Sequence, residues 1–178
     1  MDVVQTGLNG LLLIKPKVFG DKRGFFYEMF QEERYRAAGV DVHFVQDNVS
    51  SSAKNVLRGL HFQTRNPQDK LVSVLVGEVF DVAVDIRPES ATFGKWFGAI
   101  LSEENHHQLF VPKGFAHGFC VLSDTAIFHY KCSDYYSPAN ESGIIWNDPA
   151  LGIEWPLQGE PIVSEKDTRY LPLAETLE

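Results

Sequence analysis

Short apolar runs recur along most of the chain, and their lengths are typical of β-strands. They are rich in Val, Ile and Phe and are separated by brief polar or glycine-containing segments. The clearest runs are Leu71–Val76, Val79–Ile86, Trp96–Leu101, Gln108–Val111 and Thr125–Cys132. In the second of these, apolar side chains at the even-numbered positions share one face and Asp81 and Asp85 share the other. The pattern predicts a protein built mainly from strands.

Helical patterning is confined to short segments. Gln31–Ala38 is followed by Gly39, which suits a left-handed cap at a helix end. The proline-rich, polar tail after Trp155 contains one further possible helix start, at Ser164. Many short strands with few helices indicate a closed or sandwiched antiparallel sheet. We therefore expect an all-β fold, an antiparallel jelly-roll β-barrel with a few short peripheral helices.

The length and composition fit one domain of ordinary size. The chain has 178 residues, of which 44% are hydrophobic and 22% charged, as in typical globular proteins. No internal repeat or linker-like stretch divides it, so we expect a single domain over residues 1–178. A chain of this length buries enough surface to fold without disulfides, and Cys120 and Cys132 cannot form a disulfide framework.

The charge balance excludes several classes of partner. There are 16 Lys and Arg against 24 Asp and Glu, a net charge of −8, and no basic cluster, which argues against nucleic-acid binding. The apolar runs are far shorter than the about twenty residues that a membrane-spanning helix needs. No signal-peptide pattern opens the chain. We expect a cytoplasmic protein with no nucleic-acid or membrane partner, and a small anionic ligand held by one or two arginines stays open.

Two histidine-containing motifs are the strongest candidates for chemistry. In Arg58–Gln63 (RGLHFQ), His61 precedes Lys70, which heads a predicted strand. In Pro112–Phe119 (PKGFAHGF), His117 lies in a glycine-rich bend before a strand. A strand-borne histidine at a barrel mouth serves as a base, a metal ligand or a core residue. The neighbouring glycines allow the backbone and a ligand to approach closely.

The first of these motifs argues against a metal site. The second motif is similar to the second half-motif of the cupin superfamily of jelly-roll barrels. Metal-binding cupins carry two histidines and a glutamate in their first half-motif, but the matching stretch here reads His61-Phe62-Gln63. His61 and His117 alone do not fill a transition-metal site. The adjacent pair His106-His107 would point to opposite faces of a strand, so we expect it at the surface and predict no metal.

The run from Pro16 to Asp167 resembles the dTDP-4-dehydrorhamnose 3,5-epimerase family, a metal-free group of cupin sugar epimerases. The matching stretches occur in the family's order and cover most of the chain. They are Phe19–Phe26, Gln46–Asn48, Arg58–Gln63, Lys70–Val72, Gly77–Arg87, Pro112–Phe119, Tyr135–Pro138, Trp146–Pro149 and Ser164–Asp167. The resemblance implies a cupin-type barrel and an isomerase that uses no metal and no redox cofactor.

The resemblance also implies which groups react. Epimerisation beside a ketone needs a base on one face, an acid on the other and a positive charge for the enolate oxygen. The implied roles are His61 as base, Asp167 as the carboxylate that orients it, Tyr130 as acid and Lys70 as the positive charge. Each has a plainer interpretation when taken alone. Tyr130 suits a core aromatic, Asp167 a capping partner of Ser164, and Lys70 a solvated strand start.

Further positions match family residues that bind the nucleotide sugar. Guanidinium groups suit phosphate oxygens, and the resemblance implies that Arg23 and Arg58 bind the diphosphate. Phe26 and Tyr136 are expected to stack on the base or sugar ring. The remaining implied binding residues are Glu28, Gln46, Asn48, His117, Glu141 and Lys166. Polar residues at such positions also serve to order loops.

The expected reaction is inversion of C3 and C5 of dTDP-4-dehydro-6-deoxy-D-glucose to give dTDP-4-dehydro-L-rhamnose, in dTDP-L-rhamnose biosynthesis. The alternatives are an enzyme that epimerises one carbon or isomerises the ketone in another deoxysugar pathway, and a sugar-nucleotide-binding cupin without catalysis. A metal-dependent cupin is a further alternative that the motif disfavours.

The resemblance finally implies a homodimer. The extended N-terminal segment, Leu11–Val18 followed by Phe25–Phe30, is expected to cross to the neighbouring subunit. Edge strands of a barrel readily add to a partner's sheet, and two-fold dimers are the commonest closed assemblies. Arg23 and Phe26 would then reach the neighbour's site.

Overall fold

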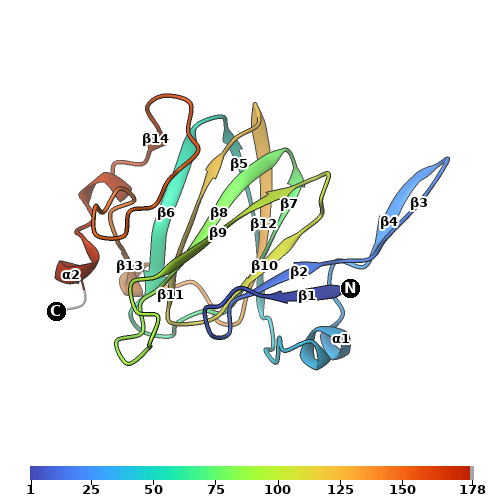
Figure 1. The fold of residues 1–178 in the computed structure, drawn as a ribbon, viewed down its shortest axis with the longest axis horizontal. Coiled ribbons are helices and arrows are strands. Elements are labelled where there is room, and N and C mark those ends of the chain that lie inside the picture. The colour runs from blue at the N-terminus through green and yellow to red at the C-terminus, as the bar shows by residue number, and fades with distance from the viewer. Residues whose placement is uncertain (177–178) are drawn as a thin grey trace.

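Two antiparallel sheets face each other and enclose the core of the protein in the computed structural model, which describes residues 1–176 (Figure 1). The order of the first sheet is β1 (Asp2–Gln5), β2 (Leu12–Lys15), β10 (Gln108–Val111), β7 (Lys70–Val76), β12 (Thr125–Cys132) and β5 (Gln46–Ala53). The order of the second is β13 (Glu141–Gly143), β6 (Val56–Gln63), β11 (Phe115–Val121), β8 (Glu78–Asp85) and β9 (Trp96–Ser102). A short strand, β14 (Ile162–Val163), pairs in parallel with β6. The predicted all-β jelly-roll barrel is confirmed.

Alternation along the strands decides which side chains enter the barrel. The interior cluster between the sheets contains Val72 and Val74 of β7, Val79 and Ala83 of β8, and Phe128 of β12. On β8 the predicted two-faced pattern holds. The even-numbered apolar residues pack outward against the C-terminal part of the chain, in a second cluster with Leu151 and Leu173. The polar face of β8 points inward, and this direction places Asp81 inside the barrel.

Helices are short and peripheral. Helix α1 (Glu32–Ala37) starts at Gln31, whose side chain accepts a hydrogen bond from the Arg34 amide, and Gly39 follows it with a φ of 102°. The expected helix at Ser164 is instead a single 3₁₀ turn, η2 (Asp167–Arg169). The other helical elements are η1 (Pro138–Asn140) and α2 (Leu173–Thr176). No helix within residues 1–176 is long and apolar enough to cross a membrane.

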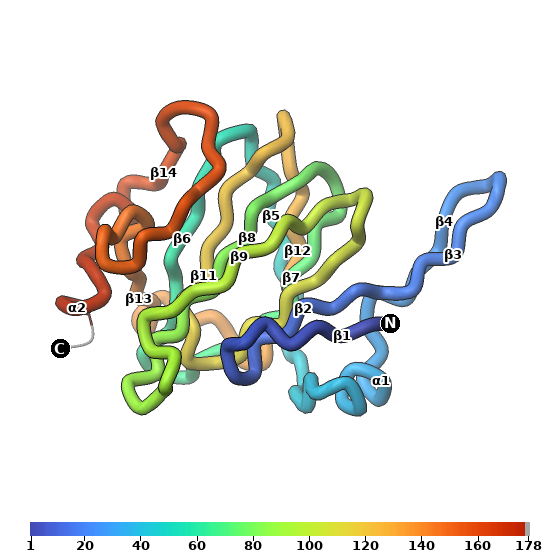
Figure 2. Tube along the Cα trace, in the orientation of Figure 1, coloured from blue at the N-terminus to red at the C-terminus, as the bar shows by residue number. Residues whose placement is uncertain are grey.

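A β-hairpin projects from the body of the protein, as Figure 2 shows. It consists of β3 (Val18–Asp21) and β4 (Gly24–Tyr27), and we call residues 18–27 the arm. Its aromatic side chains lie open, with exposed fractions of 55% for Phe19, 62% for Phe25 and 69% for Phe26. Burying such apolar surface is favourable, so the arm is suited to pack against a further surface.

Candidate active site

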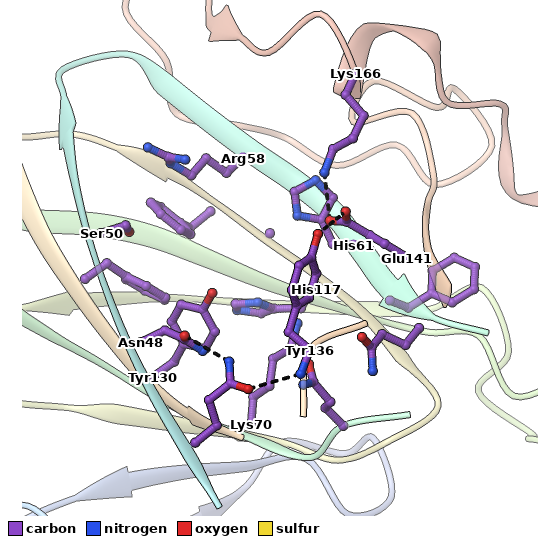
Figure 3. A pocket seen from close by; sticks show the side chains of 17 residues that line it. Asn48, Ser50, Arg58, His61, Lys70, His117, Tyr130, Tyr136, Glu141 and Lys166 are labelled. Atoms are coloured by element: carbon purple, nitrogen blue, oxygen red, sulfur yellow. Dashed lines mark hydrogen bonds and ion pairs between the residues drawn. The ribbon is translucent and has the colours of Figure 1, made fainter. Parts of the chain in front are cut away.

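A cleft with a volume of about 320 Å³ opens into the barrel between the two sheets (Figure 3). This volume lies within the range of small-molecule sites. Most of the residues expected at the site line it. They are Gln46, Asn48, Arg58, His61, Lys70, His117, Tyr130, Tyr136, Glu141 and Lys166. The topology brings them together from six strands, β5, β6, β7, β11, β12 and β13, and from the loops that carry Tyr136 and Lys166.

A β-bulge in β6 places both Arg58 and His61 on the cleft. Residues three apart on a regular strand point to opposite faces. Here the pairing with β11 shifts register, so that Arg58 lies opposite Phe119 while His61 lies opposite His117. Gly59 makes this possible because its φ is 138° and a Cβ there would lie 2.6 Å from Gly118 Cα. The glycines therefore serve close backbone approach, as their position beside the histidines predicted.

His61 is backed by a buried carboxylate. Its Nε2 lies 2.8 Å from Oδ1 of Asp167, whose side chain is 2% exposed. The Gly59 amide donates to Oδ2 at 3.3 Å, and the Asp167 amide donates to Ser164 Oγ at 3.1 Å. Burial by itself raises the pKa of Asp167, but the hydrogen bonds and the charge of His61 outweigh it and hold that pKa below its ordinary value. Asp167 thus fits both interpretations: its side chain binds His61, and its backbone amide is capped by Ser164.

Lys70 and Tyr130 lie on the sheet opposite His61. Tyr130 on β12 is flanked by Val72 on β7 and Asn48 on β5. Burial raises the pKa of Tyr130, so its phenol stays protonated at neutral pH. Burial lowers the pKa of Lys70, and the nearby Cys132, Asp81 and Glu141 act in the opposite direction. The two walls of the cleft therefore carry a histidine on one side and a phenol and an amine on the other.

His117 forms a second histidine–carboxylate pair, with Asp81. It lies within strand β11 and not in a bend before a strand, because the turn ends at Gly114 and pairing begins at Phe115. Its Nε2 lies 2.9 and 3.0 Å from the two Asp81 oxygens. Sequence reasoning did not identify Asp81 as a site residue. The signal was present, since Asp81 lies between Val79 and Ala83 on the face of β8 that it shares with Asp85.

A network of polar side chains closes the outer end of the cleft. Glu141 accepts hydrogen bonds from Tyr136 Oη and Lys166 Nζ, both at 2.7 Å (Figure 3). The Tyr136 amide donates to Gln46 Oε1 at 3.0 Å, and Gln46 Nε2 donates to Asn48 Oδ1 at 3.0 Å. Burial raises the pKa of Glu141, but its hydrogen bonds to Lys166 and Tyr136 outweigh this and lower the pKa overall. The network holds an ionised carboxylate at the mouth.

Three expected binding residues do not line this cleft in their own chain. Arg23 pairs with Asp21 at the tip of the arm, with an Nη2–Oδ2 distance of 2.6 Å, and its side chain is 83% exposed. Phe26 also lies on the arm, and Glu28 pairs with Arg34 at 2.9 Å. Within one chain these three residues therefore lie outside the cleft that contains His61, and their contact with a nucleotide sugar stays a prediction.

The histidines and carboxylates of residues 1–176 form no group of three or more that is arranged to hold a metal ion. Gln63, at the position where a metal cupin carries a ligand, uses its amide to bind the backbone at Asn66 and Ser137.

The placement of His106-His107 differs from the expectation of a surface pair. They lie in the loop between β9 and β10 and not on a strand, and they are half-buried. The His106 ring is tilted against Phe25 and stacked on Tyr27, with centroid distances of 4.7 Å to each.

The fold defines a cupin-type barrel with a ligand-sized internal cleft. Comparison with known proteins then assigns the family. The profile of the dTDP-4-dehydrorhamnose 3,5-epimerase family matches residues 5–175, and the chain belongs to that family. It is accordingly an enzyme of the isomerase class that epimerises a sugar nucleotide.

Individual relatives agree with this assignment. The dTDP-4-dehydrorhamnose 3,5-epimerase of Escherichia coli K12 is 54% identical over 179 residues, covering 99% of this chain and 97% of the relative. The corresponding protein of Neisseria gonorrhoeae is 59% identical over 94% of this chain, which spans about half (51%) of that relative's length. A solved structure of the dTDP-6-deoxy-D-glucose-3,5-epimerase of Legionella pneumophila, in complex with dTDP-4-keto-L-rhamnose, is 55% identical. It has a TM-score of 0.95 and covers 97% of this chain and 93% of its own.

Proposed function

We propose that this enzyme inverts C3 and C5 of dTDP-4-dehydro-6-deoxy-D-glucose, giving dTDP-4-dehydro-L-rhamnose for dTDP-L-rhamnose biosynthesis. The observation that carries the proposal is the placement of the His61–Asp167 pair across the cleft from Lys70 and Tyr130. The ligand of the Legionella relative, a 4-keto sugar nucleotide, supports the substrate class. The reaction needs proton transfer only, and His61, Lys70 and Tyr130 of the cleft, with Asp167 behind His61, are the groups that we propose for it.

The first step removes a proton beside the C4 ketone. With Nε2–H donating to Asp167, the lone pair of His61 is on Nδ1, which accepts the proton from C3 or C5. The electron pair of the broken C–H bond moves to the ketone oxygen. Asp167 stabilises the imidazolium that forms, and the Lys70 ammonium stabilises the enolate oxygen.

The second step returns a proton to the same carbon from the opposite face. Tyr130 donates its phenolic proton to the enolate carbon, the C4 ketone re-forms, and the configuration is inverted. A phenol is acidic enough because the enolate is a strong base at that moment. The phenolate and the imidazolium then exchange protons with water, and the second carbon is inverted by the same two groups. No electrons are gained or lost.

The rest of the cleft is proposed to bind the nucleotide. Arg58 lies exposed at the mouth, where Ser52 Oγ accepts a hydrogen bond from its Nε at 3.1 Å, and its two terminal guanidinium nitrogens suit the diphosphate. Tyr136 is proposed to stack on the base. The further proposed contacts to the nucleotide sugar are Gln46, Asn48, His117, Glu141 and Lys166.

The arm completes the site if the protein is a homodimer. Its exposed phenylalanines and the exposed Arg23 lie away from their own cleft, and we propose that the arm delivers Arg23, Phe26 and Glu28 to the partner subunit's cleft. Mixing Arg23→Ala chains with His61→Ala chains tests this. Heterodimers would contain one site with both defects and one with neither, so activity should reappear. No recovery in verified heterodimers would contradict the crossing.

Proton NMR in deuterated water with the 4-keto sugar nucleotide tests the reaction itself. We expect deuterium at both C3 and C5 and the inverted product. Exchange at one carbon would indicate a single-carbon epimerase, and tight binding without exchange would indicate a binding protein. His61→Asn is the control, because it removes the base and should abolish exchange at both carbons while dTDP binding persists.

A further inference from the structure

The hydrogen bond between His61 and Asp167 fixes one atom of the proposed base and leaves the plane of its ring undetermined. Asp167 accepts from Nε2 at 2.8 Å. Hydrogen bonds tolerate angles well away from linear, so a ring held only at Nε2 can turn about that atom. The proposed proton transfer needs Nδ1 directed into the cleft, and catalytic groups must be held within about 0.5 Å and 10–20° of the productive geometry. A second contact on the ring would complete its placement.

The strand beside β6 provides no side chain for this contact. Within the second sheet His61 lies between His117 of β11 and Gly143 of β13. Residues directly opposite each other on antiparallel strands share a face, and their side chains pack side by side. Because residue 143 is a glycine, β13 itself leaves that flank of His61 without a packing partner.

Tyr170 takes the place of the missing side chain. A Cβ built on Gly143 would lie 2.6 Å from both Cδ2 and Cζ of Tyr170, so the phenol ring lies where a cross-strand partner of His61 would lie. The rings of His61 and Tyr170 are in contact, with centroids 5.9 Å apart and planes at 70°, an edge-to-face arrangement that aromatic pairs favour. Tyr170 does not line the cleft. Its effect on a substrate would therefore pass through His61.

The backbone around Tyr170 is anchored on both sides. Tyr170 directly follows η2, the turn that begins with Asp167. The next residue, Leu171, forms a parallel bridge with Ile144, and its carbonyl oxygen accepts from the Ile145 amide at 3.0 Å. One short anchored segment thus presents both a carboxylate and an aromatic ring to the same histidine.

We propose that Tyr170 is a positioning residue for the epimerisation, which holds the His61 ring in the plane that directs Nδ1 into the cleft while Asp167 holds Nε2. The catalytic consequence rests on the proposed function, whereas the immobile ring is a property of the resting enzyme. The aromatic ring of Tyr170 acts here, and its hydroxyl group does not. Burial raises the pKa of this phenol to about 12, with Glu141 and Asp167 acting in the same direction, so Tyr170 offers an uncharged surface at neutral pH.

The order of the His61 ring is measured by NMR without substrate. Histidine is labelled with ¹³C at Cε1, and the His61 signal is assigned by its absence from His61→Asn. In the wild type we expect an order parameter close to that of rigid backbone, about 0.85, and in Tyr170→Ala a value below about 0.6. Tyr170→Phe should keep the ring ordered. Leu171→Ala is the matched control, because it truncates a neighbouring side chain that is 52% exposed and should leave the His61 signal unchanged.

The rate of deuterium exchange at C3 and C5 is the second readout. Misplacing a reacting group by about 1 Å costs up to about 10²-fold, so kcat in Tyr170→Ala should fall by about 10- to 10²-fold. The affinity for dTDP should stay within about twofold of wild type, because Tyr170 lies outside the cleft. Tyr170→Phe should retain the wild-type kcat. An unchanged kcat in folded Tyr170→Ala, or an equal loss in Tyr170→Phe, would overturn the proposal.

Gly143→Ala tests the same contact from the other strand. Its methyl group would displace the Tyr170 ring and should lower both the order of His61 and kcat. In the double variant Gly143→Ala/Tyr170→Ala the methyl group meets no phenol ring, so the loss in kcat should not exceed that of Tyr170→Ala alone. Additive losses would overturn the proposal. If Gly143→Ala does not fold, recovery of the fold in the double variant, measured by circular dichroism, would support the contact, and failure to recover would overturn it.

Failure of this proposal and failure of the proposed function give different results. A His61 ring that is ordered in the wild type and mobile in Tyr170→Ala, in an enzyme that exchanges no sugar proton, would support the positioning and refute the proposed function. A ring that is equally ordered in folded Tyr170→Ala would overturn the positioning, whatever the activity of the wild type.

Discussion

Replacing Asp167 with asparagine tests the histidine–carboxylate pair most directly. The carboxylate accepts from His61 Nε2 at 2.8 Å and from the Gly59 amide at 3.3 Å. An asparagine side chain has one acceptor oxygen for these two donors. If that oxygen faces Gly59, the amide nitrogen faces His61 and forces its proton onto Nδ1, the atom that must accept the substrate proton. If it faces His61, the amide nitrogen opposes the Gly59 N–H.

The size of the effect follows from the geometry. A hydrogen bond to a charged group contributes about 1.5–3 kcal/mol, and about 1.36 kcal/mol corresponds to a tenfold change in rate. Losing the charge-assisted contact to the imidazolium should therefore slow the reaction by about 10- to 150-fold. The tautomer change adds to this, so we expect a total loss of about 10²–10⁴-fold in kcat, the range for removing a general base.

The assay is deuterium exchange at C3 and C5 followed by NMR, together with calorimetric binding of dTDP. Asp167 does not line the cleft, so the affinity for dTDP should stay within about twofold of wild type. Asp148→Asn is the control. Asp148 is a buried carboxylate of the same C-terminal part that accepts from the Leu173 amide and lies away from the cleft. Wild-type exchange in folded Asp167→Asn would refute the role of this carboxylate.

The remaining predictions concern the proposed acid Tyr130, the bulge in β6 and the stability of the fold at low pH. Tyr130→Phe should still exchange protons into the starting sugar while inverted product falls sharply, and inversion at the wild-type rate would make Tyr130 a core aromatic. Gly118→Ala should lower the free energy of unfolding in urea by about 1–3 kcal/mol, because its Cβ would lie 2.6 Å from the Arg58 carbonyl oxygen. At Gly20 a Cβ would make only an ordinary contact, 3.9 Å from the Gly24 carbonyl oxygen, so Gly20→Ala should change stability little. The pKa of Asp85 is pulled up by burial but held well below its ordinary value by hydrogen bonds from an arginine, a serine and a threonine, so its contribution to stability is lost as pH falls below about 4. The free energy of unfolding should therefore fall less steeply with acid in Asp85→Asn than in wild type, and equal slopes would contradict this.

The sequence by itself determined strands that carry apolar side chains on at least one face. Gln108–Val111 and Thr125–Cys132 were predicted with the bounds that the structure has. Strand β5 (Gln46–Ala53) was missed because its residues are mostly polar on both faces. One face lines the cleft with Gln46 and Asn48, and the other is largely exposed. A strand that faces a polar cleft carries no apolar alternation, so periodicity cannot find it.

Only the tertiary structure decided which of these side chains meet. His61 and Asp167 are 106 residues apart, and His117 and Asp81 are 36 apart. The alternation of a strand is local, but the face that becomes interior depends on how the sheets pack. The bulge that turns both Arg58 and His61 inward depends on the close approach of Gly59 to Gly118 on another strand. The resemblance could therefore indicate His61, Asp167 and His117 but not Asp81, while closure of the barrel determined how these side chains meet.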